Sequence, residues 1–201
     1  MSESPALNVS LFILAGGKSS RMGTDKAFLE WEGSTLIDRA LHCARSVTPH
    51  VTIVGSREKF EKFAPVIEDK YLDQGPLGGI HAALAASLAE KNPVLAVDMP
   101  FMPPAFLLYL LEQAVASPAS WVVIPRAAGH LQPLCAIYRR EFGGVAENAL
   151  RAGRNRIDVL FNRLPLRVIE ETELKDAGFS PSIFRNLNTP QELESARNGN
   201  P

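Results

Sequence analysis

Short apolar runs alternate with segments of helical periodicity along most of this chain, and this alternation restricts the fold more than any other sequence feature. Such runs have the length of buried strands, and apolar residues at every third or fourth position indicate amphipathic helices. Strands that alternate with helices form a mainly parallel sheet with helices on both faces. We therefore expect an α/β fold with three layers, α/β/α. The expected strands are 9–14, 51–54, 66–67, 94–97, 121–124, 134–138 and 166–169, with a short extended piece at 28–31. The expected helices are 35–47, 59–63, 80–89, 103–116, 139–150, 157–162 and 191–196.

Length and composition favour one domain. The chain has 201 residues, 46% hydrophobic and 21% charged, so a single domain (1–201, core about 9–196) can bury a sizeable core. A net charge of -1 argues against a nucleic-acid partner. No apolar run reaches the ~20 residues of a membrane span, and residues 1–8 lack the regions of a signal peptide. Cys43 and Cys135 both lie within apolar patterns, so we expect them to be reduced residues of the core. Reduced cysteines are typical of a cytoplasmic protein, and we therefore expect that location.

The first apolar run leads into a glycine-rich loop that carries two cations. Residues 14–26 read LAGGKSSRMGTDK. The three glycines allow a sharp turn and a close backbone approach to a ligand, while Arg21 and Lys26 supply positive charge. Backbone N–H groups and two cations together can hold a polyphosphate. The alternative is an ordinary turn with surface charges, which needs neither this many glycines nor both cations.

Two better-known nucleotide-binding motifs do not match this loop. The letters GKS at 17–19 imitate the end of a Walker A motif, but the position where that motif needs its first glycine is Phe12. The dinucleotide fingerprint G-x-G-x-x-G does not fit, because the glycines at 16 and 17 are adjacent. The loop is therefore of another kind.

The order Leu-Ala-Gly-Gly-x-Ser-x-Arg-Met-Gly-x-Asp-Lys resembles the opening motif of the small nucleotidyltransferases. Within that superfamily it is most similar to the molybdenum cofactor guanylyltransferases, which transfer GMP from GTP to molybdopterin. Gly-Pro-Leu-Gly-Gly at 75–79, Gln-Pro-Leu at 132–134 and Asn-x-Asn-Thr-Pro at 186–190 extend the resemblance over most of the chain. The resemblance implies a Rossmann-like nucleotidyltransferase fold and Mg²⁺ as the cofactor.

Asp98 is a candidate metal ligand from its position alone. It directly follows the apolar run 94–97, and open α/β sheets bind ligands at the carboxyl ends of their strands. A carboxylate there needs a strong partner, and Mg²⁺ that bridges triphosphate oxygens needs a hard oxygen ligand. The alternative is a structural cap. The resemblance gives the same metal role to the aspartate of this Asp-x-Pro segment.

The resemblance also implies the contacts of each substrate. GTP would be bound by Leu14, Ala15, Gly16, Gly17, Lys26, Asp69 and Asp98. Molybdopterin would be bound by Arg21, Gly23, Gly75, Gly79, Gln132, Arg156, Asn186 and Asn188. Val54 stands where some relatives carry an asparagine that touches the nucleotide. His81 is expected to be a helix-face residue rather than a catalyst.

Several of these assignments have structural alternatives. Asp69 could belong to a solvated acidic turn, and Gln132 could be a loop residue before a strand. Either Arg154 or Arg156 could meet the anionic acceptor. Asn188 could equally cap the last helix.

The expected reaction needs no covalent enzyme intermediate. A terminal phosphate oxygen of molybdopterin attacks the α-phosphorus of GTP and pyrophosphate leaves, so catalysis consists of positioning and charge neutralisation. Arg21, Lys26 and Asp98 would be the catalytic residues, the two cations on the β- and γ-phosphates and Asp98 on Mg²⁺. The alternatives are a cytidylyltransferase for the same pterin, a sugar-phosphate nucleotidyltransferase, and a catalytically silent nucleotide-binding partner in cofactor delivery. Further partners would be cofactor-biosynthesis proteins and the enzymes that accept the product.

Overall fold

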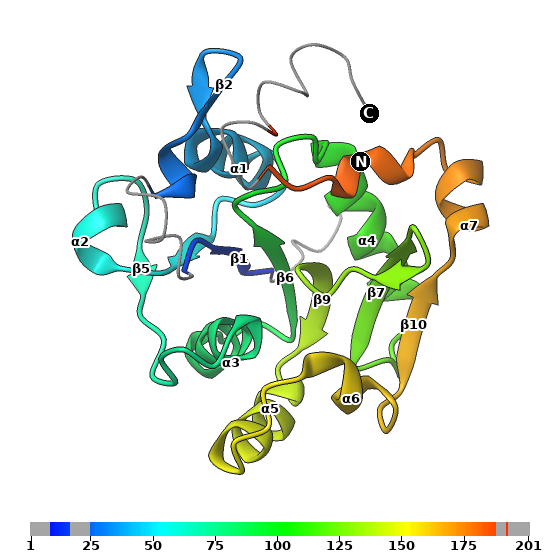
Figure 1. Ribbon diagram of the computed structural model, residues 1–201. Coiled ribbons are helices and arrows are strands. Elements are labelled where there is room, and N and C mark those ends of the chain that lie inside the picture. Colours follow the sequence, from blue (N-terminus) through cyan, green and yellow to red (C-terminus); the bar gives the residue numbers. More distant parts are fainter. Residues whose placement is uncertain (1–8, 17–24, 188–191, 193–201) are drawn as a thin grey trace, which may run out of the picture.

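The computed structural model describes residues 9–16, 25–187 and 192, and Figure 1 shows how they are arranged. The strands are β1 (Leu11–Leu14), β2 (Glu30–Trp31), β3 (Ser34–Thr35), β4 (Val51–Val54), β5 (Val66–Ile67), β6 (Lys91–Ala96), β7 (Val122–Ala127), β8 (His130–Leu131), β9 (Cys135–Arg139) and β10 (Leu166–Ile169). The α-helices are α1 (Leu36–Arg45), α2 (Arg57–Phe60), α3 (Pro76–Ala86), α4 (Pro104–Ala116), α5 (Phe142–Arg151), α6 (Ile157–Phe161) and α7 (Glu171–Asp176). Two 3₁₀ helices are η2 (Lys26–Phe28) and η3 (Pro181–Phe184).

The main sheet is mostly parallel. Its order is β10-β7-β9-β6-β1-β4-β5, with β8 paired to β7, while β2 and β3 form a separate two-stranded sheet. The pairs of β1 with β4, β1 with β6, β4 with β5, and β7 with β10 are parallel. Strand β9 runs antiparallel to both of its neighbours, β6 and β7. The carboxyl ends of β1, β4, β5 and β6 therefore share one edge of the sheet.

Alternate residues of β1 point into two different cores. Leu11 and Ile13 pack with buried residues of α1 and α4, whereas Phe12 and Leu14 pack with buried residues of α3 and α5. Successive side chains of a strand point to opposite faces of its sheet, so an unbroken apolar strand requires cover on both faces. Figure 1 shows α1 and α4 on one side of the sheet and α3 and α5 on the other. The predicted three-layer α/β/α fold is confirmed.

Helix α1 begins at Leu36, within one residue of the predicted start, and a capping residue precedes it. Thr35 is the N-cap, and its hydroxyl accepts a hydrogen bond from the Asp38 N–H at 3.2 Å. This bond satisfies one N–H of the first turn, and the negative charge of Asp38 is favourable there. Leu36, Ile37 and Ala40 place a buried stripe against the sheet.

Helix α3 begins earlier than the predicted Ile80, at Pro76. Gly75 precedes it at φ 67°, a left-handed conformation that glycine adopts without strain. Pro76 takes the first turn, where a missing N–H costs nothing. The glycines at 78 and 79 therefore lie inside a helix rather than in a loop, and the helix ends at Ala86 instead of Ala89.

Strand β7 does not end at Ile124, before Pro125, as predicted, but continues to Ala127. Its pairing with β9 stops at Val123, so the absent N–H of Pro125 falls beyond that ladder. Arg139 belongs to β9 rather than to the next helix, which begins at Phe142. Strand β8 and helix α7 were not indicated by the sequence patterns.

In α4 the apolar spacing of the sequence predicts a core face of Phe106, Leu107, Leu110, Leu111 and Val115, and the observed face differs at one position. Val115 is 51% exposed, and Ala114 is buried in its place, beside the predicted Leu110 and Leu111. The expected helix 191–196 lies outside the described residues apart from Glu192. Within the described part of the chain, no helix combines the length and apolarity that a bilayer crossing requires.

Candidate active site

The carboxyl ends of the parallel strands form the base of the candidate site. The Leu14 carbonyl accepts a hydrogen bond from the Val97 N–H at 3.1 Å, and the Val54 carbonyl accepts one from the Ala15 N–H at 2.9 Å. These bonds extend the ladders past β1 and β6 and hold the start of the glycine loop over β4. At Gly16 an added Cβ would lie 3.8 Å from the Val54 oxygen. The predicted GTP contacts Leu14, Ala15 and Gly16 therefore lie together at this edge.

Asp98 and Lys26 meet at the same edge. Lys26 Nζ donates to Asp98 Oδ2 at 2.5 Å, across 72 positions of sequence. Asp98 is 4% exposed, while the Lys26 side chain keeps 26% of its surface exposed. A hydrogen bond between two charged groups in such a shielded place is stronger than one between neutral groups. The fold thus brings together the two predicted catalytic residues that the structure describes.

The other oxygen of Asp98 is suited to a metal ion. Asp98 Oδ1 is buried and has no hydrogen-bond partner among the described residues, although buried polar atoms normally have one. The described residues contain no group of three or more metal-ligating side chains. Mg²⁺ commonly uses one or two carboxylates and completes its shell with substrate phosphates and water. Asp98 therefore fits the role of the protein's ligand to Mg²⁺.

The backbone that carries Lys26 is tied to a neighbouring helix. Asp25 caps η2, since its Oδ1 accepts from the Ala27 N–H at 3.1 Å. Its Oδ2 accepts from Lys59 Nζ on α2 at 2.7 Å. The prediction gave Asp25 no role, although an aspartate at the start of a helix is a recognisable N-cap signal.

The C-terminal segment lies against Asp98. The Leu187 N–H donates to the Asp98 backbone carbonyl at 3.0 Å, and Leu187 is fully buried. Its neighbour Asn186 is exposed. This contact brings the predicted acceptor residue Asn186 to the edge that carries Asp98. Asn188 lies outside the described residues, as do Gly17, Arg21 and Gly23, so the roles of these four stay predictions.

Asp69 lies against the first turn of α3. Its Oδ1 accepts from the Tyr71 N–H at 2.8 Å. Its Oδ2 occupies space that a side chain would need, because a Cβ at Gly78 would lie 2.3 Å from it. Partial burial raises the pKa of the Asp69 carboxyl, while the Tyr71 N–H and the charge of His81 lower that pKa. The structure therefore holds Asp69 in place rather than leaving it in a solvated turn.

The two glycines assigned to the acceptor have clear structural functions. Gly75 supplies the left-handed turn before α3. At Gly79 a Cβ would lie 3.4 Å from Leu14 Cδ2 and 3.8 Å from Val54 Cγ1. Glycine there lets α3 pack closely on β1 and β4. Their contact with the acceptor stays a prediction.

Gln132 stabilises the turn between β7 and β9. Its Nε2 donates to the carbonyls of Ala127 at 3.3 Å and His130 at 3.2 Å. Its own N–H donates to the Pro125 carbonyl at 2.9 Å. The side-chain donors thus serve the fold, which leaves the amide oxygen for the predicted contact with the pterin.

The two candidate arginines of the basic turn are both exposed. Arg156 is paired with Asp158, with Nη2 2.5 Å from Oδ2. This pair raises the pKa of Arg156 and lowers that of Asp158. Since an exposed ion pair contributes little stability, it leaves Arg156 free to exchange partners. The choice between Arg154 and Arg156 stays open.

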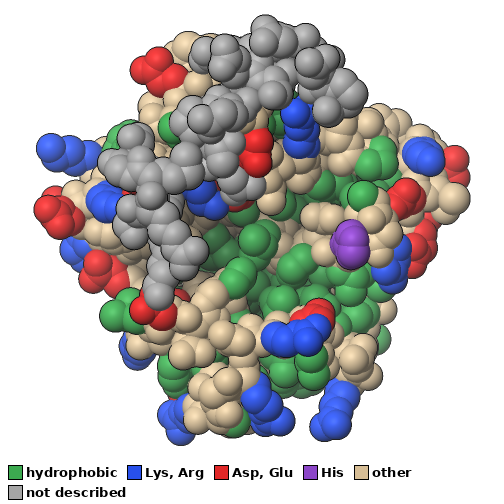
Figure 2. Space-filling view, viewed as in Figure 1, with side chains coloured by type: hydrophobic (Ala, Val, Ile, Leu, Met, Phe, Trp, Pro, Cys, Tyr) green, Lys and Arg blue, Asp and Glu red, His purple; other side chains and the backbone are tan. Residues whose placement is uncertain are grey.

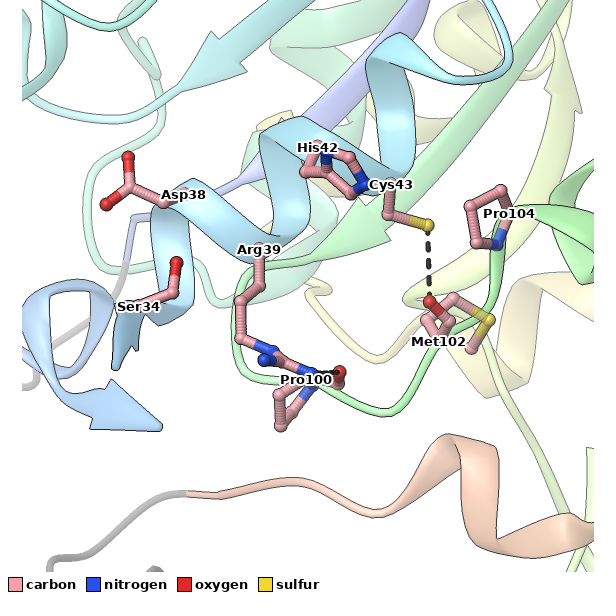
Figure 3. Close-up of a pocket in the computed structure, with 8 residues that line it drawn as sticks. All are labelled: Ser34, Asp38, Arg39, His42, Cys43, Pro100, Met102 and Pro104. Atoms are coloured by element: carbon pink, nitrogen blue, oxygen red, sulfur yellow. Dashed lines mark hydrogen bonds between the residues drawn. The ribbon is translucent and has the colours of Figure 1, made fainter. Parts of the chain in front are cut away.

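A groove of about 490 Å³ lies beside the segment that follows Asp98 (Figure 3). Its walls are Ser34, Asp38, Arg39, His42, Cys43, Pro100, Met102 and Pro104. Arg39 Nη2 donates to the Pro100 carbonyl at 3.5 Å, and Cys43 Sγ donates to the Met102 carbonyl at 3.3 Å. None of the predicted GTP contacts that the structure describes lines this groove, so the groove is separate from that described part of the predicted nucleotide site. Its contacts fasten the segment after Asp98 to α1.

The site and the sheet together define a class of protein, the nucleotidyltransferases of Rossmann-like fold. The fold is similar to that of molybdopterin-guanine dinucleotide biosynthesis protein A from Archaeoglobus fulgidus, with a TM-score of 0.78, 28% identity, and coverage of 94% of this chain and 97% of that chain. It is also similar to 2-C-methyl-D-erythritol 4-phosphate cytidylyltransferase from Thermus thermophilus, with a TM-score of 0.68, 19% identity, and coverage of 94% and 97%. This second likeness shows the fold alone.

The chain belongs to the family of MobA-like NTP transferase domains, whose family model matches residues 11–167. A probable molybdenum cofactor guanylyltransferase of Pelotomaculum thermopropionicum is 36% identical over 187 residues, which cover 92% of this chain and 90% of that protein. A molybdenum cofactor guanylyltransferase of Syntrophotalea carbinolica is 31% identical and covers 96% and 92%. The predicted family and the nucleotidyltransferase class are confirmed.

Proposed function

We propose that this chain transfers GMP from GTP to molybdopterin and releases pyrophosphate, which forms the molybdopterin guanine dinucleotide cofactor. The proposal is supported by relatives named molybdenum cofactor guanylyltransferase. The observation that carries it is the contact of Lys26 with the nearly buried Asp98 at the carboxyl edge of the sheet. A cation and a metal-binding carboxylate side by side are what a magnesium triphosphate requires.

The reaction is a single displacement at the α-phosphorus. An oxygen of the terminal phosphate of molybdopterin forms a bond to that phosphorus, and the bond to the bridging oxygen of pyrophosphate breaks. A phosphate monoester has a second pKa of about 6 and is mostly dianionic at pH 7, so no general base is needed. The protein must align the two substrates and neutralise the charge that builds up on pyrophosphate.

Lys26 and Asp98 would have different electrostatic roles, one toward the phosphates and one toward the metal ion. In the structure the ammonium of Lys26 neutralises Asp98. With the triphosphate bound, Lys26 would turn to the β- and γ-phosphates, and Asp98 would hold Mg²⁺ through the oxygen that has no partner among the described residues. Bound Mg²⁺ supplies Lewis-acid charge at the phosphate oxygens. The Asp25–Lys59 contact keeps η2, and thus Lys26, in reach of both partners.

Asp69 would select the base. Guanine presents two adjacent donors, N1–H and the 2-amino group, and a fixed carboxylate can accept from both. Asp69 is held by the Tyr71 N–H and by its packing over Gly78. Cytosine lacks this pair of donors, so the arrangement favours GTP over CTP.

The acceptor would lie across the same edge of the sheet. Figure 2 shows hydrophobic side chains gathered at the centre of this face, over β6 and β9, where a flat pterin ring could pack. Gln132 would offer its amide oxygen, and an arginine of the 154–156 turn would meet the anionic phosphate.

We also propose that the protein acts in the cytoplasm with other cofactor-biosynthesis proteins and the enzymes that accept the product. The free, buried thiols of Cys43 and Cys135 suit that reducing compartment.

Pyrophosphate release tests this function. The purified protein is incubated with Mg²⁺ and either GTP or CTP, each with and without molybdopterin. We expect release only with GTP and molybdopterin together. Release with CTP instead would identify a cytidylyltransferase. Release that depends on a sugar phosphate in place of molybdopterin would identify a sugar-phosphate nucleotidyltransferase, and no release from any mixture would favour a silent binding partner.

A further inference from the structure

A histidine lies buried beside the proposed base-reading carboxylate. His81 on α3 is 6% exposed, and its Nδ1 is buried with no hydrogen-bond partner among the described residues. The Tyr71 ring closes it in edge-to-face, with ring centroids 5.2 Å apart and an interplanar angle of 78°. A buried imidazole nitrogen without a partner is costly. Packing alone does not explain a polar ring here, since an apolar side chain would fill the same space.

The imidazole and the carboxylate lie along one face of α3. Asp69 packs over Gly78, and residues three apart in a helix lie on the same face, so His81 is the next side chain along that face. Tyr71 links the two, because its N–H donates to Asp69 Oδ1 and its ring covers the imidazole.

We propose that His81 is a positioning residue that holds Asp69 for guanine recognition. This inference rests on the proposed function. The imidazole adds a polar group one helical turn along α3 from the glycine over which the partly buried Asp69 carboxylate packs, and it supports the Tyr71 ring whose backbone fixes that carboxylate. The charge of His81 lowers the pKa of Asp69 against the effect of burial. The charged groups on the neighbouring α5 are Arg151 and Glu147, which pair with each other, and the Tyr71 side chain helps to raise the pKa of Arg151.

One ring substitution and one matched pair of variants separate positioning from packing. His81→Phe keeps a ring against Tyr71 but removes both nitrogens. His81→Gln and His81→Met have similar length, and only glutamine is polar. Each variant is compared with the wild type for thermal unfolding, for KM and kcat in pyrophosphate release, and for the preference for GTP over ITP, which lacks the 2-amino group.

We expect His81→Phe to raise the KM for GTP by about five- to tenfold and to lower the GTP-over-ITP preference, with kcat within about twofold. His81→Gln should retain more of the preference for GTP over ITP than His81→Met. This comparison tests the proposal even if the His81→Phe protein does not fold. In the Asp69→Asn background, His81→Phe should add little, because it acts through Asp69.

An unchanged KM for GTP and an unchanged GTP-over-ITP preference in a folded His81→Phe protein would overturn the proposal. The proposal would also fail if His81→Phe had its full effect in the Asp69→Asn background. Equal behaviour of the glutamine and methionine variants would also overturn it. Calorimetric binding of GTP and ITP gives a second readout that needs no turnover. If the wild type released no pyrophosphate, the proposed function would fail, while a weaker GTP-over-ITP binding preference in His81→Phe would still support the positioning role.

Discussion

Lys26→Met is expected to destabilise the protein as well as inactivate it. The substitution leaves Asp98, 4% exposed, without its partner on Oδ2, while Oδ1 has none among the described residues. Removal of one member of a fully buried ion pair costs about 3–5 kcal/mol. The Lys26 side chain is 26% exposed, so water can reach the site. We therefore expect the unfolding free energy to fall by about 2 kcal/mol.

The chain contains a matched control for this substitution. Lys59 also pairs with an aspartate at 2.7 Å, but its side chain is 50% exposed. Lys59→Met should cost less than about 1 kcal/mol, as is usual for exposed ion pairs. In the double variant Lys26→Met/Asp98→Asn no charge remains buried and unpaired, so most of the lost stability should return.

Urea unfolding followed by circular dichroism measures these differences, and pyrophosphate release measures the activity. Lys26→Met should lower kcat/KM for GTP by about 10²–10³-fold, the effect of deleting one preorganised donor, and should weaken GTP binding more than molybdopterin binding. Equal stability losses for Lys26→Met and Lys59→Met would refute the argument from burial. An equal loss of affinity for both substrates would refute the assignment of Lys26 to the triphosphate.

Three further predictions concern single side chains. Asp98→Ala should retain the fold by circular dichroism but lose Mg²⁺-dependent turnover, and normal GTP consumption would contradict the metal assignment. Arg167 lowers the pKa of Glu173 below its ordinary 4.5, so this pair stabilises the protein above that pH and less as the pH falls. The difference in thermal midpoint between wild type and Glu173→Gln should therefore shrink below about pH 4.5. A difference that grew as the pH fell would contradict the lowered pKa of Glu173. Thr35→Ala should cost about 1 kcal/mol through loss of the α1 cap, measured by urea unfolding, whereas Thr35→Ser should cost less.

Short-range patterns in the sequence sufficed for most of the fold. The unbroken apolar runs of β1 and β6 predicted buried parallel strands, because only a strand covered on both faces buries every residue. Local signals also predicted α1 and α4. The start of α3 was misplaced because glycine is a poor helix former by propensity. The close approach of Asp69 to Gly78 requires glycine at that position in spite of that cost.

Part of the candidate site was also predictable from sequence. Asp98 was recognisable because a carboxylate directly after a buried strand needs a partner. Lys26 was recognisable because it places a positive charge at the end of a glycine-rich loop. Asp25 and His81 received no functional role. Their functions depend on Lys59 and Tyr71, which contact them only in the folded chain.

The sequence by itself determined the class of fold and the chemical groups that the site employs, since both follow from local pattern and residue type. Only the tertiary structure decided which of those groups meet. Lys26 reaches Asp98 across 72 residues, and Leu187 reaches the carbonyl of Asp98 from the end of the continuous described segment 25–187. The physical reason is that parallel strands bring their carboxyl ends to one edge of the sheet in an order set by packing of the layers, which no local pattern specifies.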